Sequence, residues 1–116
     1  MTVGNRGKSE LDRQFEVTSE RTSAEHRIEV AGEMDLSVIR ELDREMREAE
    51  ASDSERIVLD LRQLEFMDAA GIRLLLELDE RAKGNGRRLR IKSALSPAVQ
   101  RVFELTGAGE ILPFEG

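Results

Sequence analysis

The amino-acid sequence predicts one α/β domain with a mixed, mostly parallel β-sheet and packed helices, in the order β-β-α-β-α-β-α-(β). Short apolar runs alternate with stretches of helical periodicity. The connections between the later strands are long enough to hold a helix, which implies parallel neighbours. The first two strands are joined by a short polar turn, which is typical of an antiparallel hairpin. A chain of 116 residues has the usual length of a single domain.

The first half of the sheet is predicted from alternation. Residues 1–12 are polar, lack periodicity and are predicted to be a flexible lead-in. A strand follows over 13–18, and after the polar turn SERTSAE a second strand follows in HRIEVAG (26–32), where apolar and charged residues alternate. These two strands are expected to form a hairpin, closed by GEMD (32–35) as a loop.

The middle of the chain reads as helix, strand and helix. Apolar residues at helical spacing predict a helix over 36–51, and Asp35 is of the residue type that caps such a helix. The run RIVLDL (56–61) is almost continuously apolar, as expected of a strand that is covered on both faces. A second helix is predicted over 69–83, ending at the turn GNG (84–86).

The last third ends the fold. The segment RLRIK (88–92) alternates, so its basic residues should face outward. The third helix has marks at both ends: Ser96 as N-cap, Pro97 at the first helical position and Gly107 as terminator. Ile111 and Leu112 are predicted to form a final short strand.

Composition excludes several classes of protein. There is no cysteine, which excludes disulfides and thiolate metal sites. The net charge of −6 argues against nucleic-acid binding, which needs a basic face, and the lack of Trp and Tyr argues against base stacking. No apolar stretch is long enough for a membrane span or a signal peptide, so a cytoplasmic location is predicted.

Enzymatic chemistry is not predicted. The single histidine, His26, lies in a strand whose other residues look structural, and no metal-ligand or nucleotide-binding motif occurs. The glycine pairs Gly84/Gly86 and Gly107/Gly109 follow helices and therefore read as C-terminal caps, not phosphate cradles. No metal and no cofactor is expected.

The junction MDAAG (67–71) is the best candidate for a functional site. It follows the third predicted strand, and ligands and partners of open α/β sheets gather at the carboxyl ends of parallel strands. Asp68 fits the N-cap of the next helix, and Gly71 in its first turn would let another surface approach closely. The alternative, that Asp68 only caps and Gly71 only packs, stays open.

Three segments of the sequence resemble the STAS domain in its free-standing bacterial form, the anti-sigma factor antagonists. They are GEMDLSVIREL, IVLDLRQLEFMDAAGIRLLLELDERAKGNGRRLRI and SPAVQRVFELTGAGEILPF, within residues 15–114. The resemblance implies a STAS domain over 13–116. It also implies a non-catalytic partner switch that binds an anti-sigma factor, itself a serine kinase, and so releases a sigma factor.

The resemblance also implies a phosphorylation site that this chain lacks. In the family the kinase modifies the residue after the aspartate of a D-S-[ST]-G motif, and the phosphate breaks the complex. Asp68 and Gly71 match that motif, whereas Ala69 stands at the phosphoacceptor position and Ala70 at the second hydroxyl position. Three explanations remain: an antagonist that is always competent, a scaffold regulated elsewhere, or an engineered variant of a phosphorylatable parent.

A partner surface is expected around this turn. The alternative is a scaffold or adaptor subunit of a signalling assembly or homodimer, in which the second helix packs on another STAS domain. That helix is unusually apolar, which burial of both its sides explains better than a partner patch does. A small-ligand sensor, the third hypothesis, rests only on the strand-end cleft. The expected partner contacts are Glu33, Asp35, Asp68, Ala69, Ala70, Gly71 and Ile72.

Overall fold

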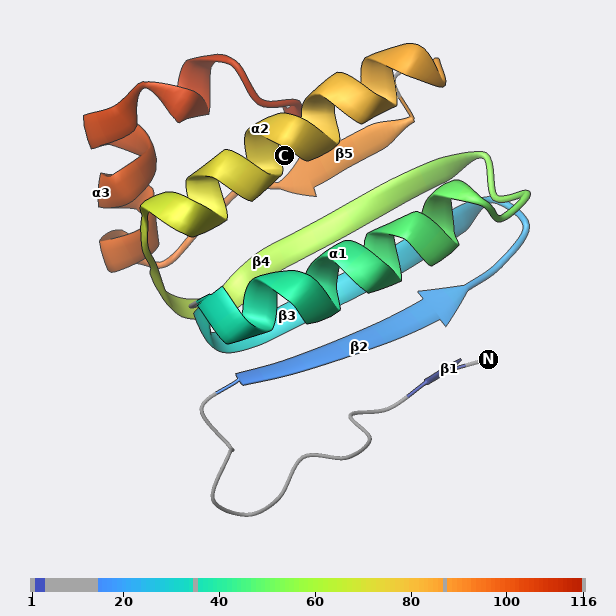
Figure 1. The fold of residues 1–116 in the computed structure, drawn as a ribbon, viewed down its shortest axis with the longest axis horizontal. Helices are drawn as coiled ribbons and strands as arrows, with labels where there is room; N and C mark the ends of the chain where they lie inside the picture. The colour runs from blue at the N-terminus through green and yellow to red at the C-terminus, as the bar shows by residue number, and fades with distance from the viewer. Residues whose placement is uncertain (1, 4–14, 35, 87, 116) are drawn as a thin grey trace.

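The computed structural model describes residues 2–3, 15–34, 36–86 and 88–115, whose path is drawn in Figure 1. Within them, no helix combines the length and the hydrophobicity needed to cross a membrane. The elements are β1 (Thr2–Val3), β2 (Phe15–Arg21), β3 (Glu25–Met34), α1 (Leu36–Glu50), β4 (Arg56–Met67), α2 (Ala69–Gly84), β5 (Leu89–Lys92), α3 (Pro97–Thr106), the 3-10 turn η2 (Ala108–Glu110) and β6 (Phe114–Glu115).

The strands form one six-stranded sheet in the order β1-β2-β3-β4-β5-β6. The pairs β1–β2 and β2–β3 are antiparallel. The pairs β3–β4, β4–β5 and β5–β6 are parallel. The predicted hairpin and the predicted mixed, mostly parallel sheet are therefore confirmed.

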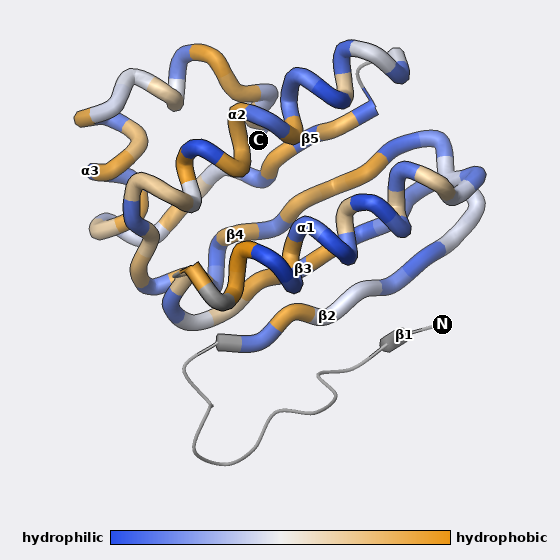
Figure 2. Tube along the Cα trace, viewed as in Figure 1, coloured by the Kyte–Doolittle hydropathy of each residue, from blue (hydrophilic) through white to orange (hydrophobic). Residues whose placement is uncertain are grey.

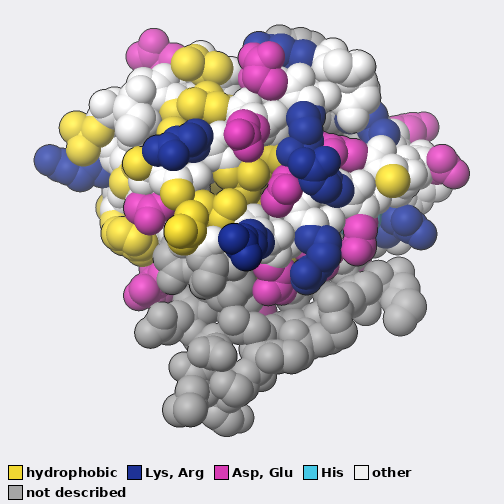
Figure 3. All heavy atoms as spheres, viewed as in Figure 1, with side chains coloured by type: hydrophobic (Ala, Val, Ile, Leu, Met, Phe, Trp, Pro, Cys, Tyr) yellow, Lys and Arg dark blue, Asp and Glu magenta, His cyan; other side chains and the backbone are white. Residues whose placement is uncertain are grey.

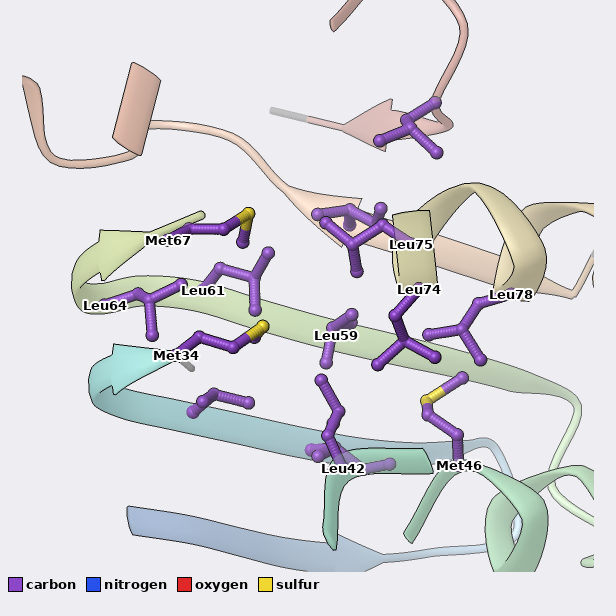
Figure 4. Packing of buried hydrophobic residues seen from close by; sticks show 14 of the residues in the cluster. Met34, Leu42, Met46, Leu59, Leu61, Leu64, Met67, Leu74, Leu75 and Leu78 are labelled. Carbon is purple, nitrogen blue, oxygen red and sulfur yellow. The ribbon is translucent and has the colours of Figure 1, made fainter. Parts of the chain in front are cut away.

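The main core lies between one face of the sheet and the helices α1 and α2, which lie side by side over that face (Figure 1). Figure 2 shows hydrophobic residues along the strands beneath them, and Figure 4 shows the interdigitated side chains. α3 packs against β4 through the buried Val99 and Phe103. The buried side chains of the sheet and of the two long helices include Ile28, Val30, Ile57, Leu59, Leu61, Leu89, Ile91, Leu42, Met46, Leu74, Leu75 and Leu78.

Residues 56–61 were predicted to form a strand that is covered on both faces, and the cover on the face away from α1 and α2 has an unexpected composition. All residues from Ile57 to Leu61 are buried, as predicted, but the second cover is made of charged side chains. Arg62 donates from Nε to Oδ1 of Asp60 at 3.0 Å and from Nη2 to Oδ2 at 2.8 Å, and Arg27 Nη2 lies 3.7 Å from Oδ2. These hydrogen bonds from Arg62 hold the pKa of Asp60 below its ordinary value, although burial opposes them.

Both ends of the sheet differ from the sequence prediction. At the amino end, Thr2 and Val3 pair with β2, whereas the rest of the predicted lead-in lies outside the described residues. At the carboxyl end, the last strand is Phe114–Glu115, not 111–112. The main-chain oxygen of Pro113 accepts a hydrogen bond from Ile91 N–H at 3.0 Å, so pairing with β5 begins after this proline.

α3 confirms its three predicted end residues, although Ser96 acts differently from a usual N-cap. Pro97 occupies the first turn, and Gly107 is the left-handed C-cap with φ 76°. Ser96 occupies the N-cap position but makes no side-chain cap hydrogen bond. Its hydroxyl instead donates to the main-chain oxygen of Leu64 at 3.0 Å, so it ties the start of α3 to β4.

His26 lies at the amino end of β3, with 6% of its surface exposed. Burial lowers the pKa of its imidazole below the ordinary 6.5, as do Arg21 and Arg88, and Glu48 opposes them. Within the described residues, its Nδ1 atom has no hydrogen-bond partner. The folded protein therefore favours the neutral imidazole.

We expect His26 to make the protein less stable in mild acid. Above pH 6.5 neither state binds the proton, so His26 adds no pH dependence. Below that pH the unfolded chain takes up the proton first, and the free energy of unfolding falls until the pH passes below the folded-state pKa. Urea unfolding at about pH 7.5 and about pH 5.5, for the parent and for His26→Gln, measures this difference.

Between the two pH values, the free energy of unfolding should change less in His26→Gln than in the parent. Asp43 and Asp60 have pKa values lowered below 3.8, so their contributions disappear only at a lower pH. If parent and variant lost equal stability between the two pH values, the neutral burial of His26 would be wrong.

Candidate functional site

The candidate site lies where β3 and β4 end side by side. Glu33 pairs with Phe66 and Met34 with Met67 in parallel register. The segment GEMD was predicted as a loop, but residues 32–34 are the last residues of β3. β4 likewise continues to Met67, beyond the predicted end at 61, through register irregularities opposite the end of β3. The two strands therefore bring GEMD and MDAAG to the same edge of the sheet.

Asp68 caps α2, as predicted. Its backbone is extended, with φ −107° and ψ −173°. Its Oδ1 atom accepts hydrogen bonds from the backbone N–H of Ala70 at 3.0 Å and of Gly71 at 3.3 Å. These two N–H groups would otherwise lack partners at the start of the helix. The side chain also lies at the positive end of the helix dipole.

Removing this cap should destabilise the protein. Asp68→Ala is expected to lower the free energy of unfolding by about 1 kcal/mol, because two N–H groups lose their acceptor. Asp68→Asn is the matched control, since asparagine caps helices about as well, and it should lose much less. Chemical denaturation measures both variants. Equal losses in the two would mean that the charge, and not the cap, carries the stabilisation.

Ala69 lies on the surface at the first position of α2, and Ala70 is half-buried behind it. The phosphoacceptor position implied by the resemblance is thus accessible but carries only a methyl group. The first turn of α2 contains no acidic residue, so Asp68 is the carboxylate nearest to it in the chain. The first turn of α2 is therefore exposed at Ala69 and has no acidic side chain of its own, and the capping carboxylate of Asp68 directly precedes it.

Gly71 is buried, and its close contacts are inside the molecule. A Cβ atom on Gly71 would lie 2.6 Å from Cγ of Met67 and 3.0 Å from Sδ of Met34. Figure 4 shows these two methionines at the adjacent ends of β3 and β4. The alternative in which Gly71 packs inside the protein is therefore the arrangement found, and its role in the approach of a partner stays a prediction.

The apolar residues of α2 pack inside the protein. Ile72, Leu74, Leu75 and Leu78 are buried, and Leu76 is half-buried. Burial of both sides, the alternative left open by the sequence, is the arrangement found. These leucines position the helix and are not a surface patch.

Two exposed apolar side chains near this edge were not predicted from the sequence. Leu36 is 70% exposed at the start of α1, and Phe66 is 48% exposed opposite Glu33. Figure 3 shows hydrophobic side chains gathered around the first turns of α1 and α2. Glu33 is also exposed. Asp35, which was predicted both as a helix N-cap and as a partner contact, lies outside the described residues. We call Glu33, Leu36, Phe66, Asp68 and Ala69 the α2 N-terminal surface.

The position of Phe66 in the sequence, directly before Met67, could have predicted its exposure. A phenylalanine one residue before a buried methionine at the end of a strand must point to the opposite side of the sheet. The sequence prediction ended β4 at 61 and therefore assigned Phe66 to no face. Leu36 had a weaker signal, since it precedes the apolar stripe of α1 by less than one turn.

The rest of the described chain offers little for catalysis at this edge. No group of three or more His, Asp or Glu side chains in the described ranges could hold a metal ion. His26 pairs with Ile57 at the amino ends of β3 and β4, the opposite end from Asp68. His26 is therefore far from the α2 N-terminus.

Comparison with known proteins supports the resemblance. The family model described as "Mlab, STAS domain" matches residues 17–113. The structure of an anti-sigma factor antagonist from Mycobacterium paratuberculosis is similar over 86% of this chain and 84% of that chain, with a TM-score of 0.75 and 23% identity.

Two further similar structures are forms of one antagonist. Unphosphorylated SpoIIAA is similar over 86% of this chain and 88% of that chain, with a TM-score of 0.70 and 22% identity. SpoIIAA in the phosphorylated form, described as a Bacillus cell fate determinant, is similar over 86% and 91%, with a TM-score of 0.64 and 22% identity. At this level of identity the structural likeness shows a shared fold.

Proposed function

The chain belongs to the STAS domain family, and we propose that it is a non-catalytic, cytoplasmic anti-sigma factor antagonist. In this proposal it binds an anti-sigma factor of the serine-kinase type and so releases a sigma factor. Two of the similar structures carry the name of anti-sigma factor antagonist, which supports this choice among the roles of the family.

The observation that carries the proposal is the exposed start of α2. Ala69 lies on the surface directly after a capping aspartate, at the edge where β3 and β4 end. The family resemblance assigns the phosphoacceptor to this position. An accessible helix N-terminus beside exposed apolar side chains can contact a partner without any rearrangement of the core.

The proposed contact residues divide by burial. Glu33 and Ala69 are exposed and Asp68 and Ala70 are half-buried, so these four contact the partner directly. Leu36 and Phe66 join them as apolar contacts. The remaining predicted residues are the buried Gly71 and Ile72, which support the turn from inside, and Asp35, which stays a prediction.

In this proposal the switch is fixed in its binding state. A phosphoserine would place a charge of about −1.5 to −2 at the first position of α2, close to Asp68. Ala69 has no hydroxyl, so this modification cannot occur there. The partner surface at residue 69 therefore stays uncharged whether or not a kinase is present.

The test is direct binding to a serine-kinase anti-sigma factor from the same organism. Calorimetric titration should give a one-to-one complex with the parent protein. Ala69→Ser restores the acceptor hydroxyl, so incubation with that kinase and radiolabelled ATP should label the variant and leave the parent unlabelled. Absence of binding to every such anti-sigma factor in the organism would contradict the proposal.

The alternative is a scaffold subunit or homodimer, which would use the same exposed residues. Light scattering of the protein alone separates the two functions. A monomer that forms a complex only with the anti-sigma factor supports the switch. A stable dimer without the partner, broken by Leu36→Asp or Phe66→Asp, would favour the scaffold.

A further inference from the structure

A second concave site lies away from the α2 N-terminal surface. A pocket of about 240 Å³ opens between the loop after β5, the helix α3, η2 and β6. We call it the β5–α3 pocket, and it shares no residue with the α2 N-terminal surface. The carboxyl end of a parallel strand is a common ligand position in α/β sheets. The lining residues are Ser93, Leu95, Gln100, Phe103, Gly109 and Phe114.

The lining is neutral and partly aromatic. The rings of Phe103 and Phe114 meet edge to face with centroids 5.3 Å apart. Leu95 adds an aliphatic wall, and the polar groups are the side chains of Ser93 and Gln100. In the described part of the chain, the Ser93 hydroxyl makes no hydrogen bond, whereas its backbone N–H donates to the main-chain oxygen of Glu115 at 3.0 Å. One hydroxyl is thus available to a ligand.

The loop at the edge of this pocket has strained backbone. Ala94 has φ 68°, and within the described residues no other non-glycine residue has a positive φ. Side chains disfavour this conformation, which is found disproportionately at ligand sites and switch regions. The strained residue lies between the two lining residues Ser93 and Leu95 and fixes their relative direction.

We propose that the β5–α3 pocket binds a small neutral molecule that carries one ring and one hydrogen-bonding group. A cavity of about 150 Å³ is enough for benzene, so the larger volume here fits a ring with a short polar substituent. The ring packs against the half-buried Phe114 and Leu95, since Phe103 is only 1% exposed, and the polar group bonds to Ser93. A charged ligand is disfavoured, because none of the described residues that line the pocket carries a charge to pair with it.

The experiment is an NMR titration of the full chain with benzamide as the probe. Benzoate, which has the same ring and a charged group, is the matched ligand control. We expect saturable shifts of the backbone amides at 93–95, 100–103, 109 and 114, with a Kd of about 1 mM for so small a probe. Benzoate should bind at least about tenfold more weakly.

A filled pocket should abolish binding. Gly109→Leu places its Cβ in ordinary contact with Phe103 Cβ, at 3.7 Å, and fills the space. Gly84→Leu is the matched control, since no side chain among the described residues lies within 4 Å of a Cβ there. Gly109→Leu should weaken benzamide at least about tenfold and Gly84→Leu should leave it unchanged.

Ser93→Ala is the milder variant, which tests the hydrogen bond without filling the pocket. It should weaken benzamide about fivefold or more, because the amide then loses its hydroxyl partner. Shifts that do not saturate, that lie elsewhere in the chain, or that survive in Gly109→Leu would overturn the proposal. It stands or falls independently of the anti-sigma partner, because every measurement uses the chain alone.

Discussion

Replacing Ala69 with aspartate is expected to weaken binding to the anti-sigma partner at least about tenfold, while the fold stays intact. In the complex, the new carboxylate would lie under the partner, directly after the carboxylate of Asp68. An unpaired charge that is buried in this way can cost several kcal/mol, and each ~1.4 kcal/mol is tenfold in affinity. The affinity should therefore fall far more than the stability.

The stability of this variant should hardly change. An acidic residue in the first turn of a helix contributes about 0.3–1 kcal/mol, which offsets the lower helix propensity of aspartate relative to alanine. Ala69 is exposed in the free protein, so the new side chain meets no core atom. Urea unfolding should give a free energy within about 0.5 kcal/mol of the parent.

Ala69→Asn separates charge from size in the calorimetric titration. Asparagine has nearly the same shape as aspartate but no charge, so it should keep most of the affinity. If aspartate and asparagine weaken binding equally, the methyl group matters for steric fit alone. If neither weakens it, residue 69 lies outside the interface and the scaffold function becomes the better hypothesis.

Much of the fold could be predicted from the sequence because its elements have strong local signals. The N-cap at Asp68, the proline at the start of α3 and the left-handed Gly107 are set by backbone hydrogen bonding within a few residues. Alternation in β2 and β3 fixed the hairpin, and the parallel strands followed from the helical connections. These features depend little on the rest of the molecule.

The missed features depend on distant parts of the chain. β4 continues to Met67 because β3 lies beside it, and the last strand forms at Phe114 because β5 offers its unpaired edge there. Asp60 is held mainly by Arg62, two residues further along the chain, and Arg27 of the neighbouring strand adds an ion pair from a distant part of the chain. No local pattern encodes the pairings between strands, so the sequence located the MDAAG junction between β4 and α2 but did not predict the exposure of Leu36 and Phe66.

Gly71→Ala is the second substitution with a large expected effect, in this case on stability. The added Cβ would lie 2.6 Å from Cγ of Met67, which is 1% exposed, and 3.0 Å from Sδ of Met34, which is fully buried. Cγ is close to the main chain, so Met67 cannot move aside by rotating its outer atoms alone. Forcing an extra methyl group into a packed core typically costs about 1–3 kcal/mol.

Intrinsic propensity acts in the opposite direction and is smaller. Alanine favours a helix over glycine by up to about 1 kcal/mol, so the net expected loss reaches about 2 kcal/mol. For a domain of this size, that loss lowers Tm by about 4 °C or more. Gly84→Ala is the matched control in the same helix, because a Cβ there meets no side chain of the described residues within 4 Å and only the propensity gain remains.

Thermal and urea unfolding of the two variants decide the role of this glycine. A destabilised Gly71→Ala beside a neutral or stabilised Gly84→Ala means that residue 71 is small so that α2 can begin directly over Met34 and Met67. If Gly71→Ala were as stable as the parent, the methionines would have moved without cost. A loss of partner affinity in such a stable variant would then show that the glycine serves the approach of the anti-sigma factor.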